Sequence, residues 1–157
     1  MPVDHQRVEL IRERTVPYDR RTTIRTPEAA VKYIREHTSV ASRPQEVMGA
    51  IFVDTRNRVL TAIPEIFVGT ADRCVVDPKP ILVAALLAGA SGFFLFHTHP
   101  SGDPSPSSED LSATRRIAEA ATIVGTKLVD HIVVGDLSLG DSGWVSIAQS
   151  HGLTPGG

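Results

Sequence analysis

The feature that most constrains the fold of this chain is an uninterrupted apolar run that ends in two histidines. Residues Phe93–Phe96 have the length of one β-strand, and unbroken apolar character is typical of a central strand covered on both faces. His97 and His99 follow at once, and residues two apart on a strand point to the same face. The sequence therefore predicts a buried strand whose end presents two imidazoles side by side.

The segment after this strand is predicted to be a loop that leads into a helix. Prolines and a glycine interrupt residues 98–106. An amphipathic helix is expected over 108–124, ended by Gly125. Ser107 and Asp110 stand at its start with the spacing of a capping box. Taken alone, these two residues indicate a helix cap.

Taken with the histidines, the same helix start indicates a metal site. Zinc binds imidazole nitrogen and carboxylate oxygen, and catalytic zinc sites keep three protein ligands plus a water. Asp110, in the first turn of the helix, is the natural third ligand for His97 and His99. The combination of apolar strand, same-face histidines, rigid loop and helix start favours a metal site over incidental histidines.

A metal-activated water also needs a base that takes its proton. The acidic residues upstream of the loop include Glu46, Asp54, Glu65 and Asp72. Asp54 lies in a predicted turn and Asp72 in a polar loop, so structural roles are expected for both. Glu46 opens an otherwise apolar strand, where a carboxylate is unusual unless it has a purpose. Spacing alone leaves Glu46 and Glu65 as alternatives.

The remaining pattern alternates strands and helices. Strands are expected at residues 7–16, 46–53, 58–68, 93–96 and 127–134, with a hairpin turn at 54–57. Helices are expected from Thr26-Pro27 to His37, and from Asp77-Pro78 onward, before a short strand and a terminal helical turn. The stretch Ile81–Ala88 is apolar nearly all round and should be buried on most sides. In the helix over 108–124, the inward residues should be Leu111, Ile117, Ala121 and Val124.

These elements predict one α/β domain, with a mixed, largely antiparallel sheet flanked by helices, over residues 1–157. A chain of 157 residues can bury roughly two thirds of its unfolded surface. The net charge of −2 gives no general attraction to nucleic acid or to an anionic membrane. The longest apolar stretch, Ile81–Ala88, is too short to span a bilayer, so no membrane partner is expected.

The only cysteine, Cys74, excludes an intrachain disulfide and favours a reducing compartment. The polar start of the chain is no signal peptide. We therefore expect a soluble, cytoplasmic protein in which Cys74 is an inert strand residue. Basic residues are concentrated in the first 25 positions, at Arg7, Arg12, Arg14, Arg20, Arg21 and Arg25. A solvated strand face is favoured there over a patch that binds phosphate or an acidic partner.

The spacing Glu46, His97-Thr98-His99, seven residues, Ser107, two residues, Asp110 resembles the signature of the JAMM, or MPN-plus, metalloproteases. The string His-x-His-Pro-Ser-Gly is similar to that of the bacterial RadC-like JAB branch. Stretches at 52–58, 67–70 and 130–135 resemble that branch as well. The resemblance covers roughly residues 25 to 150 and implies a JAB/MPN-like fold, related to that of cytidine deaminases.

The resemblance implies a role for each motif residue. His97, His99 and Asp110 would hold Zn²⁺, Glu46 would be the general base, and Ser107 would stabilise the oxyanion. The implied activity is that of a zinc peptidase or isopeptidase with peptide or ubiquitin-like protein substrates. Asp130-His131 also recurs in the family pattern. Here His131 is expected to be a buried, hydrogen-bonding residue.

The chain also departs from this family pattern. Typical RadC-like chains carry an N-terminal helix-hairpin-helix module that can contact DNA. Only about 45 residues precede Glu46, and they are predicted as strand and helix, so no such module is expected. The alternative function is a DNA-associated or assembly module with a metal site but no peptidase activity. The basic N-terminal segment is its only support, and the presence of all five motif residues favours catalysis. The sequence specifies neither the substrate nor the oligomeric state.

Overall fold

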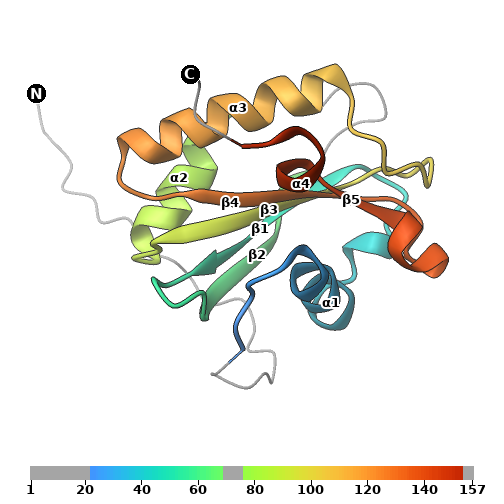
Figure 1. The fold of residues 1–157 in the computed structure, drawn as a ribbon, viewed down its shortest axis with the longest axis horizontal. Coiled ribbons are helices and arrows are strands. Elements are labelled where there is room, and N and C mark those ends of the chain that lie inside the picture. Colours follow the sequence, from blue (N-terminus) through green and yellow to red (C-terminus); the bar gives the residue numbers. More distant parts are fainter. Residues whose placement is uncertain (1–21, 69–75, 154–157) are drawn as a thin grey trace, which may run out of the picture.

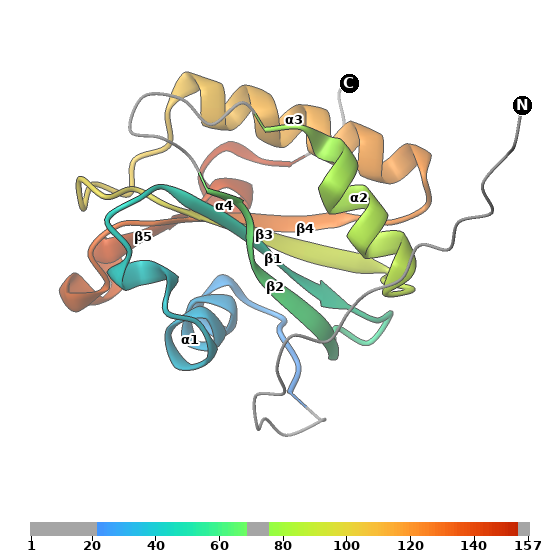
Figure 2. The same ribbon diagram turned by 180° about the vertical axis from the view of Figure 1, so that it is seen from behind.

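The computed structural model describes residues 22–68 and 76–153. The strands are β1 Val47–Val53, β2 Val59–Val68, β3 Gly92–Thr98, β4 Leu128–Val134 and β5 Trp144–Ser146. The α-helices are α1 Pro27–His37, α2 Pro78–Leu87, α3 Ser108–Ile123 and α4 Ile147–His151, and short 3₁₀ helices η1 and η2 cover Val40–Ser42 and Leu137–Gly143. Helices α2 and α3 lie on one face of the sheet and α1 lies on the other (Figures 1 and 2).

The sheet has five strands in the order β2-β1-β3-β4-β5. β1 runs antiparallel to both β2 and β3, and β5 runs antiparallel to β4. Among the strands of the described ranges, only the pair β3–β4 is parallel. The predicted mixed, largely antiparallel sheet is confirmed, and so is the hairpin of β1 and β2. β3 is the middle strand and all seven of its residues are buried, as its apolar run predicts.

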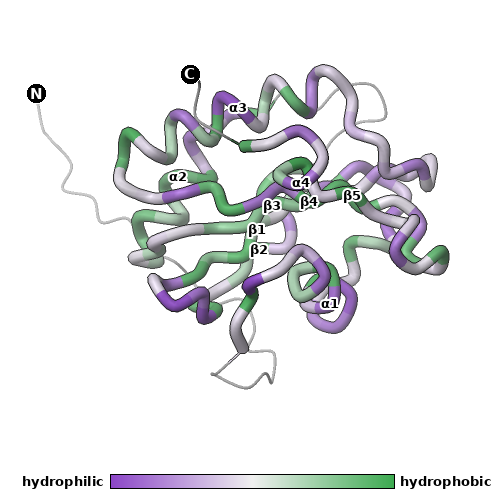
Figure 3. Tube along the Cα trace, in the orientation of Figure 1, coloured by the Kyte–Doolittle hydropathy of each residue, from purple (hydrophilic) through white to green (hydrophobic). Residues whose placement is uncertain are grey.

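Alternate residues of the central strands enter two separate cores. Ile51, Phe94 and Phe96 pack in the core that α1 covers. Phe52 and Leu95 pack in the core that α2 and α3 cover. Apolar residues follow the strands, whereas polar residues gather at the turns and on the outer sides of α1 and α3 (Figure 3). Because His97 is two residues beyond Leu95, it lies on the α2–α3 side of the sheet.

The predicted helix starts are confirmed at atomic detail. Thr26 and Asp77 each accept a backbone N–H through the side chain, and a proline follows each of them at the first helical position. Ser107 opens α3 with a complete capping box. α3 gives way to Gly125, whose φ of 84° suits a residue without a Cβ.

Two expectations about helix burial are wrong. In α2 only Ile81, Ala84 and Ala85 are buried, whereas Leu86 is 56% exposed. The reason is that α2 contacts the sheet and α3 along one side only, so an all-round apolar sequence did not mean all-round burial. In α3 the inward positions Ile117 and Ala121 are confirmed and Leu111 is half-buried. Val124 is exposed instead because it caps the helix end, and Thr114 and Ala118 complete the buried face.

Several expectations fall outside the described residues: the strand at 7–16, the arginines at positions 7, 12, 14, 20 and 21, Asp72, and Cys74. Arg25 is described and exposed. Within the described ranges, no helix combines the length and apolar character that crossing a membrane requires.

A buried carboxylate joins β4 to the C-terminal elements. Asp130 is 3% exposed and accepts hydrogen bonds from the Ser146 hydroxyl at 2.6 Å and from the Ala148 amide at 3.0 Å. It also accepts from the amide of His131 at 2.7 Å. Burial raises the pKa of Asp130, although these three hydrogen bonds act in the opposite direction. The contacts hold β5 and α4 against β4.

We expect Asp130→Ala to lower the free energy of unfolding by about 2–4 kcal/mol, because three donors in two buried hydrogen bonds and one part-buried hydrogen bond lose their acceptor. Exposed Asp141 is the control, and Asp141→Ala should change stability by less than about 0.5 kcal/mol. Urea unfolding of both variants measures the difference. Equal stabilities would contradict this account of Asp130.

Candidate metal centre

The topology of the sheet brings three chain segments to one point. β1 runs antiparallel to β3, with Met48 paired to His97, so the start of β1 lies beside the end of β3. Glu46 immediately precedes β1, and it follows the alternation of Met48 toward the α2–α3 side. The loop after β3 then returns the chain to the first turn of α3, which carries Asp110.

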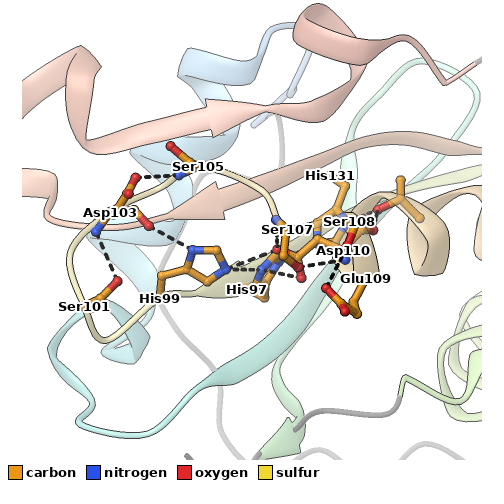
Figure 4. A network of polar contacts seen from close by, with 11 residues as sticks. His97, His99, Ser101, Asp103, Ser105, Ser107, Ser108, Glu109, Asp110 and His131 are labelled. Atoms are coloured by element: carbon orange, nitrogen blue, oxygen red, sulfur yellow. Dashed lines mark hydrogen bonds and ion pairs between the residues drawn. The ribbon is translucent and has the colours of Figure 1, made fainter. Parts of the chain in front are cut away.

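Four side chains converge there. The Nε2 atoms of His97 and His99 are 2.9 Å apart. Asp110 places Oδ1 at 3.3 Å from His97 Nε2 and Oδ2 at 3.3 Å from His99 Nε2 (Figure 4). A carboxylate oxygen of Glu46 lies within 4.8 Å of the ligand atoms of all three. The structure therefore brings together the four residues that the sequence singled out as metal ligands and base.

The spacing of these atoms fits a divalent metal. In a tetrahedral zinc site with bonds of about 2.0–2.1 Å, neighbouring ligand atoms are about 3.3 Å apart. The two separations of 3.3 Å between Asp110 and the histidines match that edge length, and the 2.9 Å between the two histidine nitrogens is slightly shorter. Two neutral imidazoles and two carboxylates also carry two negative charges, which a divalent cation balances. The residues present fit a metal in donor type, spacing and charge.

The ring of His99 is oriented by the loop that follows it. Its Nδ1 donates to the carbonyl oxygen of Asp103 at 2.8 Å, which directs Nε2 toward the centre. The loop is docked on the end of β4, because the His99 amide donates to the carbonyl of Val134. Residue 135 must be glycine here, since a Cβ would lie 2.2 Å from the carbonyl oxygen of Gly102.

The ring of His97 is oriented from the other side, by residues that the motif does not include. Its Nδ1 lies 2.7 Å from Nε2 of His131, and Nδ1 of His131 lies 2.6 Å from the hydroxyl of Thr114. That hydroxyl also lies 2.6 Å from the backbone carbonyl of Asp110. His131 was expected to be a buried hydrogen-bonding residue, and it is. Its contact with His97 and the part of Thr114 were not foreseen. Two features of the sequence could have indicated these contacts: Thr114 stands one helical turn after Asp110, and Asp130-His131 is the Asp-His pair that recurs in the family pattern.

These surroundings shift the pKa values of Asp110, His99 and His131. Burial raises the pKa of Asp110, but its contacts with His97 and His99 outweigh it and hold that pKa well below its usual value. The hydrogen bond to Asp110 raises the pKa of His99, against partial burial. Complete burial lowers the pKa of His131 well below that of a free imidazole. Asp110 is thus an anion and His131 a neutral ring.

The structure distinguishes between Glu46 and Glu65, the two carboxylates that spacing alone left as alternatives. The Thr98 hydroxyl accepts from the amide of Val47 at 3.0 Å and donates to the carbonyl of Gln45 at 3.4 Å. These contacts hold the backbone on both sides of Glu46. Glu65 instead pairs with Arg43 and is not part of the cluster. Asp54 accepts from the amides of its own turn, as expected of a structural residue.

Ser107 lies beside Asp110 as the cap of α3. Its hydroxyl oxygen accepts from the amide of Asp110 at 3.1 Å. The Asp110 carboxylate accepts from the amide of Ser107 at 2.8 Å. The capping box predicted from the sequence is therefore present, and it holds the carboxylate that contacts both histidines.

The comparison with known families agrees with this geometry. The family described as the RadC-like JAB domain matches residues 24–153. The chain belongs to the RadC-like JAB domain family. The match includes every described strand and helix and all the residues of the centre.

Curated relatives of this RadC-like domain are UPF0758 proteins. One from Geobacillus sp. (strain WCH70) is 38% identical over 131 residues, which is 82% of this chain and 57% of that protein. One from Listeria innocua is 39% identical over 142 residues, 88% of this chain and 60% of that protein. A third, from Listeria monocytogenes (strain EGD-e), is 42% identical over 124 residues, 77% and 54% of the two chains. The chain thus spans little more than half the length of these relatives.

We expect a divalent metal to stabilise the RadC-like domain. Binding to the folded state alone adds about 2.7 kcal/mol when free metal is about 100 times its Kd, so the Tm should rise as metal is added. His99→Ala should abolish the rise, and His151→Ala, an exposed histidine of α4, should retain it. Differential scanning calorimetry of the wild type and both variants, with and without metal, measures the change in Tm. An equal rise in both variants would place binding elsewhere.

Proposed function

We propose that this RadC-like domain is a zinc-dependent hydrolase that cleaves peptide or isopeptide bonds. The observation that carries the proposal is the grouping of His97, His99 and Asp110 with the carboxylate of Glu46 within 4.8 Å. In catalytic zinc sites three protein ligands leave the fourth position to a water, and a carboxylate beside that water can act as its base. The resemblance of the motif to JAMM metalloproteases supports the same reaction.

His97, His99 and Asp110 would hold the zinc ion. When bound there, zinc lowers the pKa of a coordinated water to about 7 and polarises a carbonyl group. Glu46 takes the proton of the attacking water and passes it to the leaving amine. The contacts of Thr98 with the backbone on both sides of Glu46 keep that carboxylate at the centre.

Ser107 has two tasks in this proposal. Its hydroxyl oxygen accepts the amide of Asp110, and a hydroxyl that accepts in this way still has a proton to donate. That proton would be given to the substrate oxygen on which negative charge develops. The substrates proposed are peptides or ubiquitin-like proteins, whose extended chain ends can pair with the edge of a sheet.

Replacing the base should separate binding from chemistry. We expect Glu46→Gln to keep zinc but to lower kcat by about 10²- to 10⁴-fold, because the attacking water loses its proton acceptor. Glu65→Gln is the matched control, since this exposed carboxylate pairs with Arg43 outside the cluster. Zinc content and hydrolysis of ubiquitin-like fusion substrates are the measurements. Full activity in Glu46→Gln would refute the role of Glu46 as base.

A second substitution separates the cap from the oxyanion donor. Glycine is nearly as good a helix cap as serine, so Ser107→Gly should cost only a few tenths of a kcal/mol of stability. Loss of the donor should nevertheless lower kcat by about 10²-fold. Thr26→Gly, at the cap of α1, is the control for capping alone. Unchanged kcat in Ser107→Gly would leave Ser107 as a cap only.

A further inference from the structure

His97 and Asp110 are connected through two residues that touch neither the solvent nor the centre of the site. The connection runs from His97 Nδ1 to His131 Nε2 at 2.7 Å, and from His131 Nδ1 to Thr114 Oγ1 at 2.6 Å. It ends at the backbone carbonyl of Asp110, 2.6 Å from Thr114 Oγ1. His131 is 0% and Thr114 1% exposed. The side chain of His97 and the backbone of Asp110, two residues proposed to hold the metal, are thus linked by three contacts of 2.6–2.7 Å.

The direction of each hydrogen bond on this path can be deduced. The carbonyl oxygen of Asp110 only accepts, so Thr114 donates its one proton there. Thr114 Oγ1 must then accept from His131, whose proton lies on Nδ1. His131 is completely buried against an imidazole and a hydroxyl, where a charge on the ring would be uncompensated, so the ring holds one proton and its Nε2 accepts. His97 therefore carries its proton on Nδ1. This is the arrangement that gives every contact one proton.

The deduction has a consequence for the metal. A neutral imidazole with its proton on Nδ1 has a free lone pair on Nε2, and Nε2 is the atom that faces His99 and Asp110. A metal binds only the unprotonated nitrogen. The hydroxyl of Thr114 on α3 does not contact His97, yet through His131 it holds that ring in the tautomer that can bind metal.

We propose that His131 and Thr114 are positioning residues which lock His97 in the tautomer that binds metal. The proposal rests on the metal site of the proposed function, but not on peptidase activity. The tautomer of His97 then also depends on the first turns of α3, because the Thr114 hydroxyl donates to the backbone carbonyl of Asp110 one turn earlier. The hydrogen bonds of Thr114 then link the orientation of His97, the histidine ligand from β3, to the position of Asp110, the carboxylate ligand from α3.

Thr114→Val tests this directly, because it exchanges a hydroxyl for a methyl group of similar size. His131 Nδ1–H would lose the acceptor that Thr114 provides among the described residues, in a fully buried position, which is costly. The ring avoids that cost when its proton moves to Nε2, where it points at His97 Nδ1. His97 must then carry its own proton on Nε2, toward the metal. One substitution outside the ligand set should therefore reverse the protons along the path.

The first measurement is the zinc dissociation constant by competition with a chelator. Loss of a partner that orients a ligand typically weakens binding by about 10- to 100-fold, and we expect that for Thr114→Val. Thr114→Ser restores the hydroxyl and should restore affinity. Thr122→Val is the matched control, because Thr122 donates to the carbonyl of Ala118 on the same helix. Wild-type affinity in Thr114→Val would overturn the proposal.

The second measurement reads the tautomers in the metal-free protein by long-range ¹H–¹⁵N NMR at alkaline pH. His97 should carry its proton on Nδ1 in the wild type and on Nε2 in Thr114→Val, a change that a merely structural threonine would not cause. A proton on Nε2 of His97 in the wild type would overturn the proposal even if the variant did not fold. If the wild type bound no zinc, the proposed function would fail, and the tautomers would still decide the positioning role.

Discussion

The antiparallel pairing of β1 with β3 is the constraint on which the candidate centre depends. Its register sets Met48 opposite His97, so the residue before β1 and the residues after β3 meet at one edge. The pairing is held by burial, because both strands are covered on both faces. A slip of β1 by one residue against β3 would turn Glu46 to the face of the sheet opposite His97. The apolar core therefore determines the placement of polar residues that contribute nothing to it.

A local irregularity in β4 adds a second constraint. Leu128 packs on the α2–α3 side, and regular alternation would turn residue 131 to the other side. The pairing passes instead from Phe93 with Leu128 to Phe94 with Asp130, so one extra residue is inserted. His131 consequently faces Thr114 on α3. Asp130, beside the irregularity, is held by Ser146 and Ala148. The C-terminal elements thus support the strand segment that orients His97.

Much of this was accessible from the sequence, because the signals are local. Strand and helix boundaries followed from apolar periodicity and from cap residues such as Thr26, Asp77 and Ser107, each confirmed by a side-chain hydrogen bond. Local patterns failed where burial depends on neighbours. The apolar sequence of α2 predicted burial on most sides, yet the helix sits on the outside of the layer and exposes Leu86. The apolar character of a residue favours its burial, but tertiary packing determines whether the residue is buried.

The sequence by itself determined the chemical identity of the candidate centre: two histidines at the end of a buried strand, a carboxylate at a helix start, and the JAMM-like spacing that joins them to Glu46. The tertiary structure favoured Glu46 over Glu65 independently of that resemblance, because strand register brings the start of β1 to the end of β3 and Glu65 pairs with Arg43. Only the tertiary structure joined His131 and Thr114 to His97. Their contacts cross from strand to strand and from strand to helix, over separations of 34 and 17 residues, and no local pattern encodes which side chains meet across such distances.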